Sequence, residues 1–355
     1  MNILHIIPTL GVGGAEKLLV DSLKYYRQSG VICDVAVLSN HDNIFEENIR
    51  QQGNALFIST ENSVYHLRNI LFIKKVIQNK QYDVIHCHLY AAQLFTPIAL
   101  KFCRHRPLLV TTEHSTSNRR RNILPFKMLD RKMYNNYDKI ICISNAVQLE
   151  LEKYIPTLSS KTLTIENGIE IEPFVNACPV DWENELEHYD GEKIVLMVAS
   201  LRHQKDPFTL IKAAKVLGTE YRVVFAGDGE LLHEAKRFAH SQNISNVDFL
   251  GKRQDIPSLM KAADVFVLSS KWEGFGLVVV EAAVAGVPIV TSNVSGLRDV
   301  VKSVGGQLFE PSNVYDLTKK IETSINTVKH NPNISRYDIK DTVTKHLNLY
   351  KECKK

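Results

Sequence analysis

The chain has 355 residues, of which 44% are hydrophobic, 23% charged and 8% aromatic, and its formal net charge is +4. A single hydrophobic core stops growing near about 250 to 300 residues, so this length predicts two domains. The ordinary composition excludes disordered, collagen-like and low-complexity chains. We expect no nucleic-acid partner.

Strand-like apolar runs alternate with amphipathic segments of helical length along the whole chain. In the first half we expect strands near 2–7, 32–38, 55–58, 83–87, 108–112, 138–143 and 162–165. A second series comprises the runs KIVLMVAS, YRVVFAG, NVDFLG, DVFVLSS, VPIVTS and GGQLFE. Such alternation predicts an α/β protein with two parallel sheets, each covered by helices as in Rossmann-like domains.

The domain boundary is expected in residues 171–191, a stretch rich in acidic residues that contains two prolines and shows no clean period. We predict a first domain over 1–170, a hinge over 171–191 and a second domain over 192–334. Helical patterns follow at 314–328 and 336–352. We expect the terminal helix, within 335–355, to complete the first domain.

The cysteines and the N-terminus indicate the compartment. Six cysteines lie far apart without a CxxC pair, and Cys87 and Cys142 stand inside apolar runs, which predicts buried free thiols in a reducing compartment. The start MNILHIIPTLGVGGAE lacks the features of a signal peptide. The longest apolar stretch, 276–290, is shorter than a span of about 20 residues and carries Glu281. We therefore expect a cytoplasmic location and no transmembrane helix.

Positive charge is concentrated in one segment. Between Lys101 and Lys132, nine Lys or Arg residues face two acidic residues, a local charge of +7. A basic surface interrupted by the apolar ILPF suits anionic lipid headgroups or a lipid-diphosphate acceptor, although a solvated charged face would also explain it. The candidate residues for this surface are Arg119, Arg120, Arg121, Lys127, Arg131 and Lys132.

Open parallel sheets bind ligands beyond the carboxyl ends of their strands, so the loops that follow strands carry the candidate chemistry. After the first strand come Gly11, Gly13 and Gly14, which let the backbone approach a phosphate or sugar. Glu16 stands where a dinucleotide fingerprint requires its third glycine, and a tight turn is the alternative explanation. His114 follows another strand, where it can bond a substrate hydroxyl or serve a structural role.

Two loops of the second half carry fixed charges. Arg202 and Lys205 precede a helix and can clamp a diphosphate, while Asp206 and Pro207 are typical of a helix start. The run AGDGE could be a turn alone.

The most informative loop is SSKWEGFGLVVVEAAVAG. Its glycines place Glu273 in the loop and Glu281 about one turn into an otherwise apolar helix that begins near Leu277. A buried carboxylate there needs donors, which ribose hydroxyls or a structural Arg could supply.

These motifs together resemble glycosyltransferase family 4, the retaining nucleotide-sugar enzymes of GT-B fold, in which two Rossmann-like domains face each other across a cleft. The matching elements are Glu273 and Glu281 with seven residues between them, GVGGAE, SLRHQKD, ENGIE, AGDGE and FLGKRQDIPSLMKAADVFVLSS, in the family's order over most of the chain. The resemblance departs at RHQK, where Asp206 follows the lysine in place of a glycine.

The resemblance implies roles for individual residues. Arg202 and Lys205 hold the donor diphosphate, Glu281 binds the ribose and Glu273 binds the transferred sugar. His114 faces the reacting sugar, so the catalytic set is His114, Glu273, Arg202 and Lys205. The remaining donor contacts are Gly13, Gly14, Gly274, Phe275, Gly276 and Leu277, with the base against the segment around Lys252 and Arg253.

In such enzymes the acceptor attacks from the face that the diphosphate leaves, so configuration is retained and no protein nucleophile is required. There is no DxD motif and no His or Cys cluster with ligand spacing, so we expect no obligatory metal or other cofactor. His86 and His88, in HCHLY, are interpreted as packing or acceptor-side residues.

The leading hypothesis is transfer of a hexose or N-acetylhexosamine from a UDP-sugar to a lipid-linked or growing surface glycan, such as capsule or O-antigen, at the cytoplasmic membrane face. GDP remains open as the donor nucleotide. The alternatives are an isomerase of the UDP-N-acetylglucosamine 2-epimerase type and an inactive binding subunit of a transferase.

Overall fold

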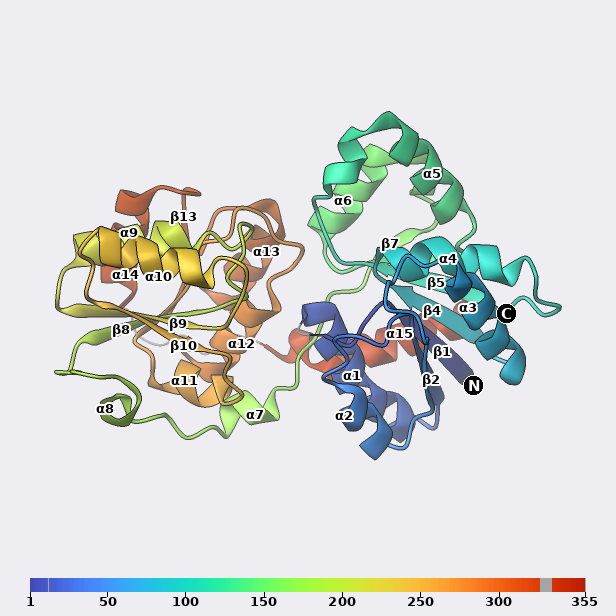
Figure 1. Cartoon of the computed structure of the whole chain (residues 1–355), viewed down its shortest axis with the longest axis horizontal. Coiled ribbons are helices and arrows are strands. Elements are labelled where there is room, and N and C mark those ends of the chain that lie inside the picture. Colours follow the sequence, from blue (N-terminus) through green and yellow to red (C-terminus); the bar gives the residue numbers. More distant parts are fainter. Residues whose placement is uncertain (12, 326–333, 355) are drawn as a thin grey trace. The chain divides into compact units, whose positions relative to one another are not determined.

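The computed structural model describes residues 1–11, 13–325 and 334–354, and within them leaves out the side chains of Arg119 and Asn122. The chain divides into two compact units (Figure 1). Unit 1 comprises residues 1–169 and 337–355, and unit 2 comprises residues 170–336.

Unit 1 is built on a parallel sheet of seven strands in the order β3-β2-β1-β4-β5-β6-β7. The chain runs outward from β1 to β3, returns to β4 and continues to β7, so the switch point of the sheet lies between β1 and β4. The strands confirm those expected from the sequence: β1 Asn2–Ile7, β2 Ile32–Val37, β3 Leu56–Ile58, β4 Val84–His88, β5 Leu108–Glu113, β6 Lys139–Cys142 and β7 Thr162–Thr164.

The helices of unit 1 cover its sheet. The terminal helix α15 packs against α1, and Tyr350 of α15 is buried in the same core as Ile3 and Leu23 (Figure 1). Helices α3 and α4 pack against each other, and α4 contacts β4 and β1. The helical elements are α1 Gly14–Gln28, α2 Glu46–Gln51, α3 Arg68–Asn79, α4 Tyr90–Leu100, η1 Arg119–Asn122, α5 Leu124–Asn135, α6 Asn145–Tyr154, η2 Pro156–Leu158, η3 Ser335–Tyr337 (which begins in unit 2) and α15 Ile339–Cys353.

Gly168, in the ENGIE motif, is needed for packing within unit 1. A Cβ atom at this position would lie 2.6 Å from the backbone nitrogen of Ile339. Only a glycine therefore allows the start of α15 to cross this segment, where Ile339 N–H donates to the carbonyl of Ile169.

Unit 2 has a six-stranded parallel sheet in the order β10-β9-β8-β11-β12-β13, so its switch point lies between β8 and β11. Figure 1 shows α9 and α10 on one face of this sheet and α11 and α12 on the other. The strands are β8 Lys193–Val198, β9 Tyr221–Ala226, β10 Val247–Gly251, β11 Val265–Leu268, β12 Ile289–Ser292 and β13 Gln307–Phe309. The helices are α7 Glu172–Val175, α8 Trp182–Glu185, α9 Pro207–Leu217, α10 Leu232–Ser241, α11 Ile256–Ala262, α12 Leu277–Ala285, α13 Ser295–Val304 and α14 Val314–Ile325.

The segment 171–191, expected as a hinge without regular structure, belongs to unit 2 and carries α7 and α8. Trp182 is buried and its indole N–H donates to the carbonyl of Ala262 at 3.0 Å. A single aromatic anchor and two one-turn helices leave no periodic pattern, which is why the sequence reads as irregular here. The expected helix at 314–328 runs to Ile325, beyond which residues 326–328 lie outside the described ranges.

Candidate functional site

In unit 2, the loop after β8 is bound by hydrogen bonds to the loops after β9 and β11, the strands on either side of β8. Leu201 N–H, after β8, donates to the carbonyl of Asp228, after β9, at 3.0 Å. The Gln204 side chain donates to the carbonyl of Trp272, after β11, at 2.9 Å, and Lys271 N–H donates to the carbonyl of Gln204 at 2.8 Å. The backbone of the loop that carries Arg202 and Lys205 is therefore held in place by the loops on both sides of it.

Lys205 and Glu273, which the sequence places 68 residues apart, form an ion pair at the switch point of unit 2. Their side chains are 20% and 8% exposed, and the same carboxylate oxygen of Glu273 accepts a hydrogen bond from the Ser270 hydroxyl at 2.7 Å. Arg202 lies on the same loop as Lys205, and its side chain is exposed to solvent. Two predicted donor-binding cations thus lie on one loop, beside the predicted sugar-binding carboxylate.

Asp206, where the resemblance leads us to expect a glycine, has a left-handed backbone with φ of 48°. Asp is one of the few residues besides glycine that adopt this region readily. Its carboxylate also accepts a hydrogen bond from the Thr209 hydroxyl at 2.7 Å, and Pro207 begins α9. The loop therefore keeps a glycine-type turn without the glycine, and the expected helix start at Asp206 and Pro207 is confirmed.

Glycines shape the loop that carries Glu273. Gly276 precedes α12 with φ of 82°, and the helix begins at Leu277 as predicted. A Cβ atom on Gly296, at the start of α13, would lie 1.9 Å from the carbonyl oxygen of Glu273. Sequence reasoning missed Gly296 because nothing local to the segment VSGLRD signals a close approach to a loop about 20 residues earlier.

The remaining donor candidates of unit 2 lie near these loops. Phe275 is buried, and Glu281 is half-buried one turn into α12, between the buried residues Val280 and Ala282. Lys252 is exposed, whereas the Arg253 guanidinium is bound by Asp255 and Glu185, which raises its pKa. The Arg253 side chain is therefore committed within unit 2, and a ligand at this segment would meet backbone groups.

In unit 1, the predicted glycine loop ends at the start of a helix. Gly14 opens α1, Gly13 is its N-cap residue, and the end of the Glu16 side chain lies over Gly13, where a Cβ atom would come within 2.1 Å of it. The loop thus places the N-terminus of α1 at the carboxyl edge of the sheet, with the Glu16 side chain folded over it.

His114 follows β5 at the same carboxyl edge. Burial lowers the pKa of its imidazole to about 4, so the ring is neutral near pH 7. Its Nε2 is buried and has no hydrogen-bond partner in the described part of the chain. A substrate hydroxyl would satisfy this nitrogen.

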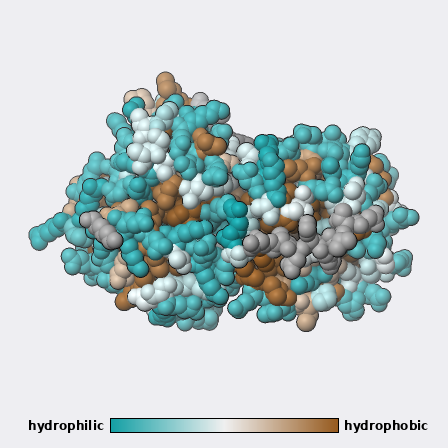
Figure 2. Space-filling view, turned by 180° about the vertical axis from the view of Figure 1, so that it is seen from behind, coloured by the Kyte–Doolittle hydropathy of each residue, from teal (hydrophilic) through white to brown (hydrophobic). Residues whose placement is uncertain are grey.

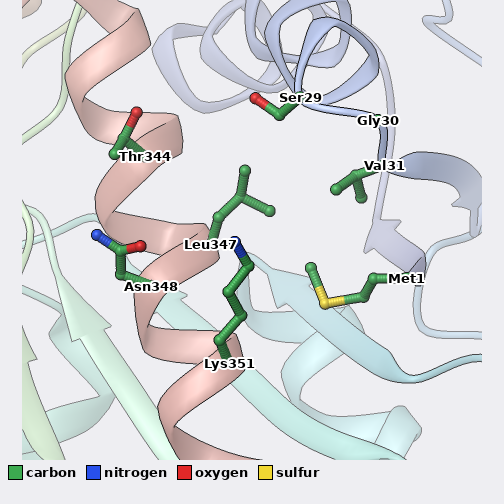
Figure 3. A pocket seen from close by; sticks show the side chains of 8 residues that line it. All are labelled: Met1, Ser29, Gly30, Val31, Thr344, Leu347, Asn348 and Lys351. Atoms are coloured by element: carbon green, nitrogen blue, oxygen red, sulfur yellow. The ribbon is translucent and has the colours of Figure 1, made fainter.

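A pocket of about 370 Å³ in unit 1 lies away from these loops (Figure 3). It is lined by Met1 and Val31, which precede β1 and β2, and by Leu347 and Lys351 of α15. These positions are at the amino ends of the strands, so the pocket does not belong to the candidate site.

Comparisons with known proteins agree with these motifs. The profile described as "Glycosyltransferase Family 4" matches residues 12–173, and the profile "Glycosyl transferases group 1" matches residues 181–341. The chain belongs to glycosyltransferase family 4.

Two curated proteins with named activities are similar in sequence to this family 4 glycosyltransferase. The UDP-Gal:alpha-D-GlcNAc-diphosphoundecaprenol alpha-1,3-galactosyltransferase of Escherichia coli is 29% identical over 252 residues, 67% of this chain and 64% of that protein. The GalNAc-alpha-(1->4)-GalNAc-alpha-(1->3)-diNAcBac-PP-undecaprenol alpha-1,4-N-acetyl-D-galactosaminyltransferase of Campylobacter jejuni is 25% identical over 345 residues, 92% of this chain and 89% of that protein.

The Anabaena protein HepE, solved in complex with UDP and glucose, matches the fold with a TM-score of 0.83 and 23% identity, covering 99% of this chain and 100% of that one. The predicted GT-B fold, with two parallel Rossmann-like sheets, is confirmed.

The basic segment of the family 4 enzyme differs from its prediction as a surface of free cations. The Arg120 side chain is 13% exposed, pairs with the fully buried Asp130 at 3.1 Å and lies over the Tyr90 ring. Arg121 is equally enclosed, 3.7 Å from Glu113. Both guanidinium groups neutralise buried carboxylates, so neither is available to a lipid headgroup. The Arg119 side chain lies outside the described part of the structure.

The other cations of the segment are exposed on α5, as expected. Lys127, Arg131 and Lys132 face solvent together with a row of apolar side chains. On the face drawn in Figure 2, apolar side chains interrupt a largely hydrophilic surface. Among the helices of the described ranges, none has both the length and the hydrophobicity that crossing a membrane requires. The exposed apolar residues at α5 are Ile123, Leu124, Phe126, Met128 and Leu129.

The structure also brings together three histidines that sequence reasoning did not connect. His5 on β1 is the register partner of His86 on β4, and His88 follows two residues later on the same face. We expected no histidine cluster, because the pairing of β1 with β4 is not visible in a local pattern. The sequence does show two histidines spaced two residues apart on one predicted strand, His86 and His88, and a third, His5, on another predicted strand. This pattern could have indicated the cluster.

Proposed function

We propose that this chain transfers a hexose or N-acetylhexosamine from a UDP-sugar to a lipid-linked or growing surface-glycan acceptor, with retention of configuration. The observation that carries the proposal is the Lys205–Glu273 ion pair at the switch point of unit 2, on the loop that also bears Arg202. The UDP donor is supported by the names of the Escherichia coli relative and the HepE complex, and the lipid-linked acceptor by both relatives.

In this proposal the donor diphosphate lies against Arg202 and Lys205, and the base lies against the backbone around Lys252 and Arg253. The Glu281 carboxylate accepts from the ribose hydroxyls, which explains a carboxylate on an otherwise apolar helix. Glu273 accepts from hydroxyls of the transferred sugar, and the amides of 274–277 at the N-terminus of α12 bind the sugar and phosphate. From unit 1, the proposal uses His114, Gly13 and Gly14.

The proposed chemistry is substitution at the anomeric carbon through an oxocarbenium-like state. The bond from the anomeric carbon to the diphosphate oxygen breaks, and the acceptor oxygen bonds to that carbon on the same face. The departing phosphate oxygen takes the acceptor proton. Arg202, Lys205 and the α12 N-terminus stabilise the negative charge that develops on the diphosphate, so this step calls for no metal ion.

The acceptor side of the proposal rests on α5. Leu124 and Met128, one helical turn apart, are 72% and 62% exposed, and Lys127, Arg131 and Lys132 stand beside them. Exposed apolar side chains flanked by cations are typical of a helix that lies in the interface of an anionic membrane. We therefore propose that α5 holds the enzyme at the membrane surface where a lipid-linked acceptor resides.

The experiment is a donor assay with purified protein. UDP-glucose, UDP-galactose and their N-acetylated forms are incubated with undecaprenyl-diphosphate-linked sugars, and the product is analysed for linkage and anomeric configuration. An α-linked product from an α-linked UDP-sugar supports the proposal. Release of an altered nucleotide sugar in the absence of acceptor would instead indicate an isomerase, and no turnover with bound nucleotide would indicate an inactive subunit.

A further inference from the structure

Three buried histidines of unit 1 lie close enough together to bind one metal ion. His5 of β1 and His86 of β4 are direct register partners, and His88 closes β4 on the same face of the sheet. One ring nitrogen of each lies within 4.8 Å of the other two. Two neighbouring strands of a rigid parallel sheet therefore fix the relative positions of all three rings.

The three imidazole rings are enclosed and lie against one another. All three side chains are buried. Their ring centroids are 5.3 Å apart for His5 and His86, 5.4 Å for His5 and His88, and 4.3 Å for His86 and His88. An imidazole binds zinc-class ions through one ring nitrogen, so three adjacent rings offer three nitrogen ligands.

The distance between the nearest ring nitrogens of His5 and His88 is close to that between two nitrogen ligands of one metal ion. His5 Nδ1 and His88 Nε2 are 3.1 Å apart. Two nitrogens bound to a tetrahedral zinc at about 2.0 to 2.1 Å would be roughly 3.3 Å apart. As neutral rings the pair makes one hydrogen bond, and the outer nitrogens, His5 Nε2 and His88 Nδ1, have no partner in the described structure. Ligation would replace that one bond by two nitrogen–metal bonds.

His86 has partners of the kind that orient a ligating histidine. Its Nδ1 is 2.6 Å from the Tyr350 hydroxyl and its Nε2 is 2.7 Å from the Thr112 hydroxyl. Metal-bound histidines almost always use their second nitrogen to bond an outer group. If His86 bound an ion, one of its nitrogens would keep its hydrogen bond to Tyr350 or Thr112. The other nitrogen would lose its hydroxyl partner and bind the ion.

We propose that His5, His86 and His88 bind one divalent transition-metal ion of the zinc class within unit 1, separate from the donor-binding loops of unit 2. Imidazole ligands favour Zn²⁺, Cu²⁺ and Ni²⁺ over Mg²⁺ or Ca²⁺. Because β1 and β4 flank the switch point of the sheet, the ion would tie together the strands that lead into the glycine loop and into α4. The proposal does not depend on the donor or the acceptor of the transferase.

The test uses untagged full-length protein, stripped with a chelator and dialysed, then titrated with Co²⁺ and competed with Zn²⁺. Bound metal is counted by mass spectrometry, the Co²⁺ absorption bands report coordination, and thermal unfolding reports stabilisation. The ligand variants are His5→Gln and His88→Gln. The matched control is His346→Gln, because His346 is a buried histidine of the same region whose ring is bonded to Tyr26, 2.8 Å away.

The proposal expects one Co²⁺ or Zn²⁺ per wild-type chain, with intense tetrahedral bands, and at least a tenfold loss of affinity in both ligand variants but not in His346→Gln. Absence of binding to the wild-type protein would overturn it. Binding that survives in both ligand variants, or that is lost equally in a folded His346→Gln protein, would also overturn it. If a ligand variant fails to fold, nuclear magnetic resonance of the imidazole nitrogens in the wild-type protein decides: unshifted resonances of His5, His86 and His88 on adding Zn²⁺ refute the site.

Discussion

The ammonium group of Lys205 is paired with the carboxylate of Glu273 across two loops that flank the switch point of unit 2. In the structure without a donor, the charge of the enclosed Glu273 carboxylate is therefore balanced by Lys205. In the donor site that we propose, the diphosphate would compete for the same ammonium group, and donor binding would therefore change the charge balance around Glu273.

Replacement of Lys205 by Ala should affect both stability and donor binding. It leaves the Glu273 carboxylate enclosed with the Ser270 hydroxyl as one remaining donor, at a cost of about 1 to 3 kcal/mol in the free energy of unfolding. Loss of a charged hydrogen bond to the diphosphate should raise the Kd for a UDP-sugar by about 10- to 100-fold. Denaturant unfolding and calorimetry measure the two effects.

The double variant Lys205→Ala/Glu273→Gln separates the two effects. Removing both charges should recover most of the stability that Lys205→Ala loses, because no buried charge remains unpaired. It should not recover donor affinity or turnover. A double variant as unstable as Lys205→Ala would show that the ion pair does not control the stability of this loop.

Asp206 provides a test of backbone conformation at the phosphate loop. Asp206→Gly should lower the free energy of unfolding by about 1 kcal/mol, because relief of the left-handed backbone only partly offsets loss of the bonds from the Thr209 and Ser312 hydroxyls. Asp206→Val should destabilise by about 2 kcal/mol or more, because a β-branched residue fits this region poorly. Donor affinity, measured by calorimetry, should be retained in the glycine variant and fall in the valine variant.

Gly296 tests whether a close backbone approach positions Glu273. In Gly296→Ala the new Cβ would meet the Glu273 carbonyl at 1.9 Å, so the loop must move. A displacement of about 1 Å can cost on the order of 100-fold in rate, and kcat/KM should fall by that order. The control is Ser295→Ala, at an exposed neighbouring position, which should leave kcat/KM within about twofold. Equal activity of Gly296→Ala and the control would refute the positioning role.

The surface of α5 can be tested on vesicles containing phosphatidylglycerol. Leu124→Glu/Met128→Glu should weaken binding at least tenfold without loss of fold, because both side chains are already exposed. Leu149→Glu is the matched control, since Leu149 is 66% exposed on α6 of the same unit. Charge reversal at Arg120 or Arg121 should destabilise unit 1 instead, because those groups pair with Asp130 and Glu113. Equal binding by the α5 variant and the control would contradict the membrane proposal.

Local patterns predicted what depends on neighbouring residues. The strands, the start of α12 at Leu277 and the start of α9 after Asp206 all follow from apolar runs and helix-start signals that lie within a few residues. Because loops after parallel strands meet at one edge, the same patterns also indicated that Arg202, Lys205 and Glu273 share an edge of unit 2.

Contacts between distant segments were not predictable in this way. The approach of Gly296 to Glu273 depends on the path of β12, and the pairing of His5 with His86 depends on which strand lies beside β1. The charge run at 119–121 indicated a basic segment, but not that Arg120 would turn inward to Asp130. A run of charged residues shows how many charges a segment carries. Whether each side chain points to solvent or to a buried partner depends on tertiary packing.

The most direct test of the central claim is calorimetric titration of the purified protein with UDP, GDP and ADP, alone and as sugar conjugates, with the Arg202→Ala variant measured in parallel. A ligand that binds the folded state must also raise its stability, so a thermal-shift assay gives an independent reading. The account predicts selective binding of UDP and UDP-sugars, weakened at least tenfold in a folded Arg202→Ala protein. Binding of no nucleotide by the folded wild-type protein, or undiminished binding by Arg202→Ala, would contradict the assigned donor site.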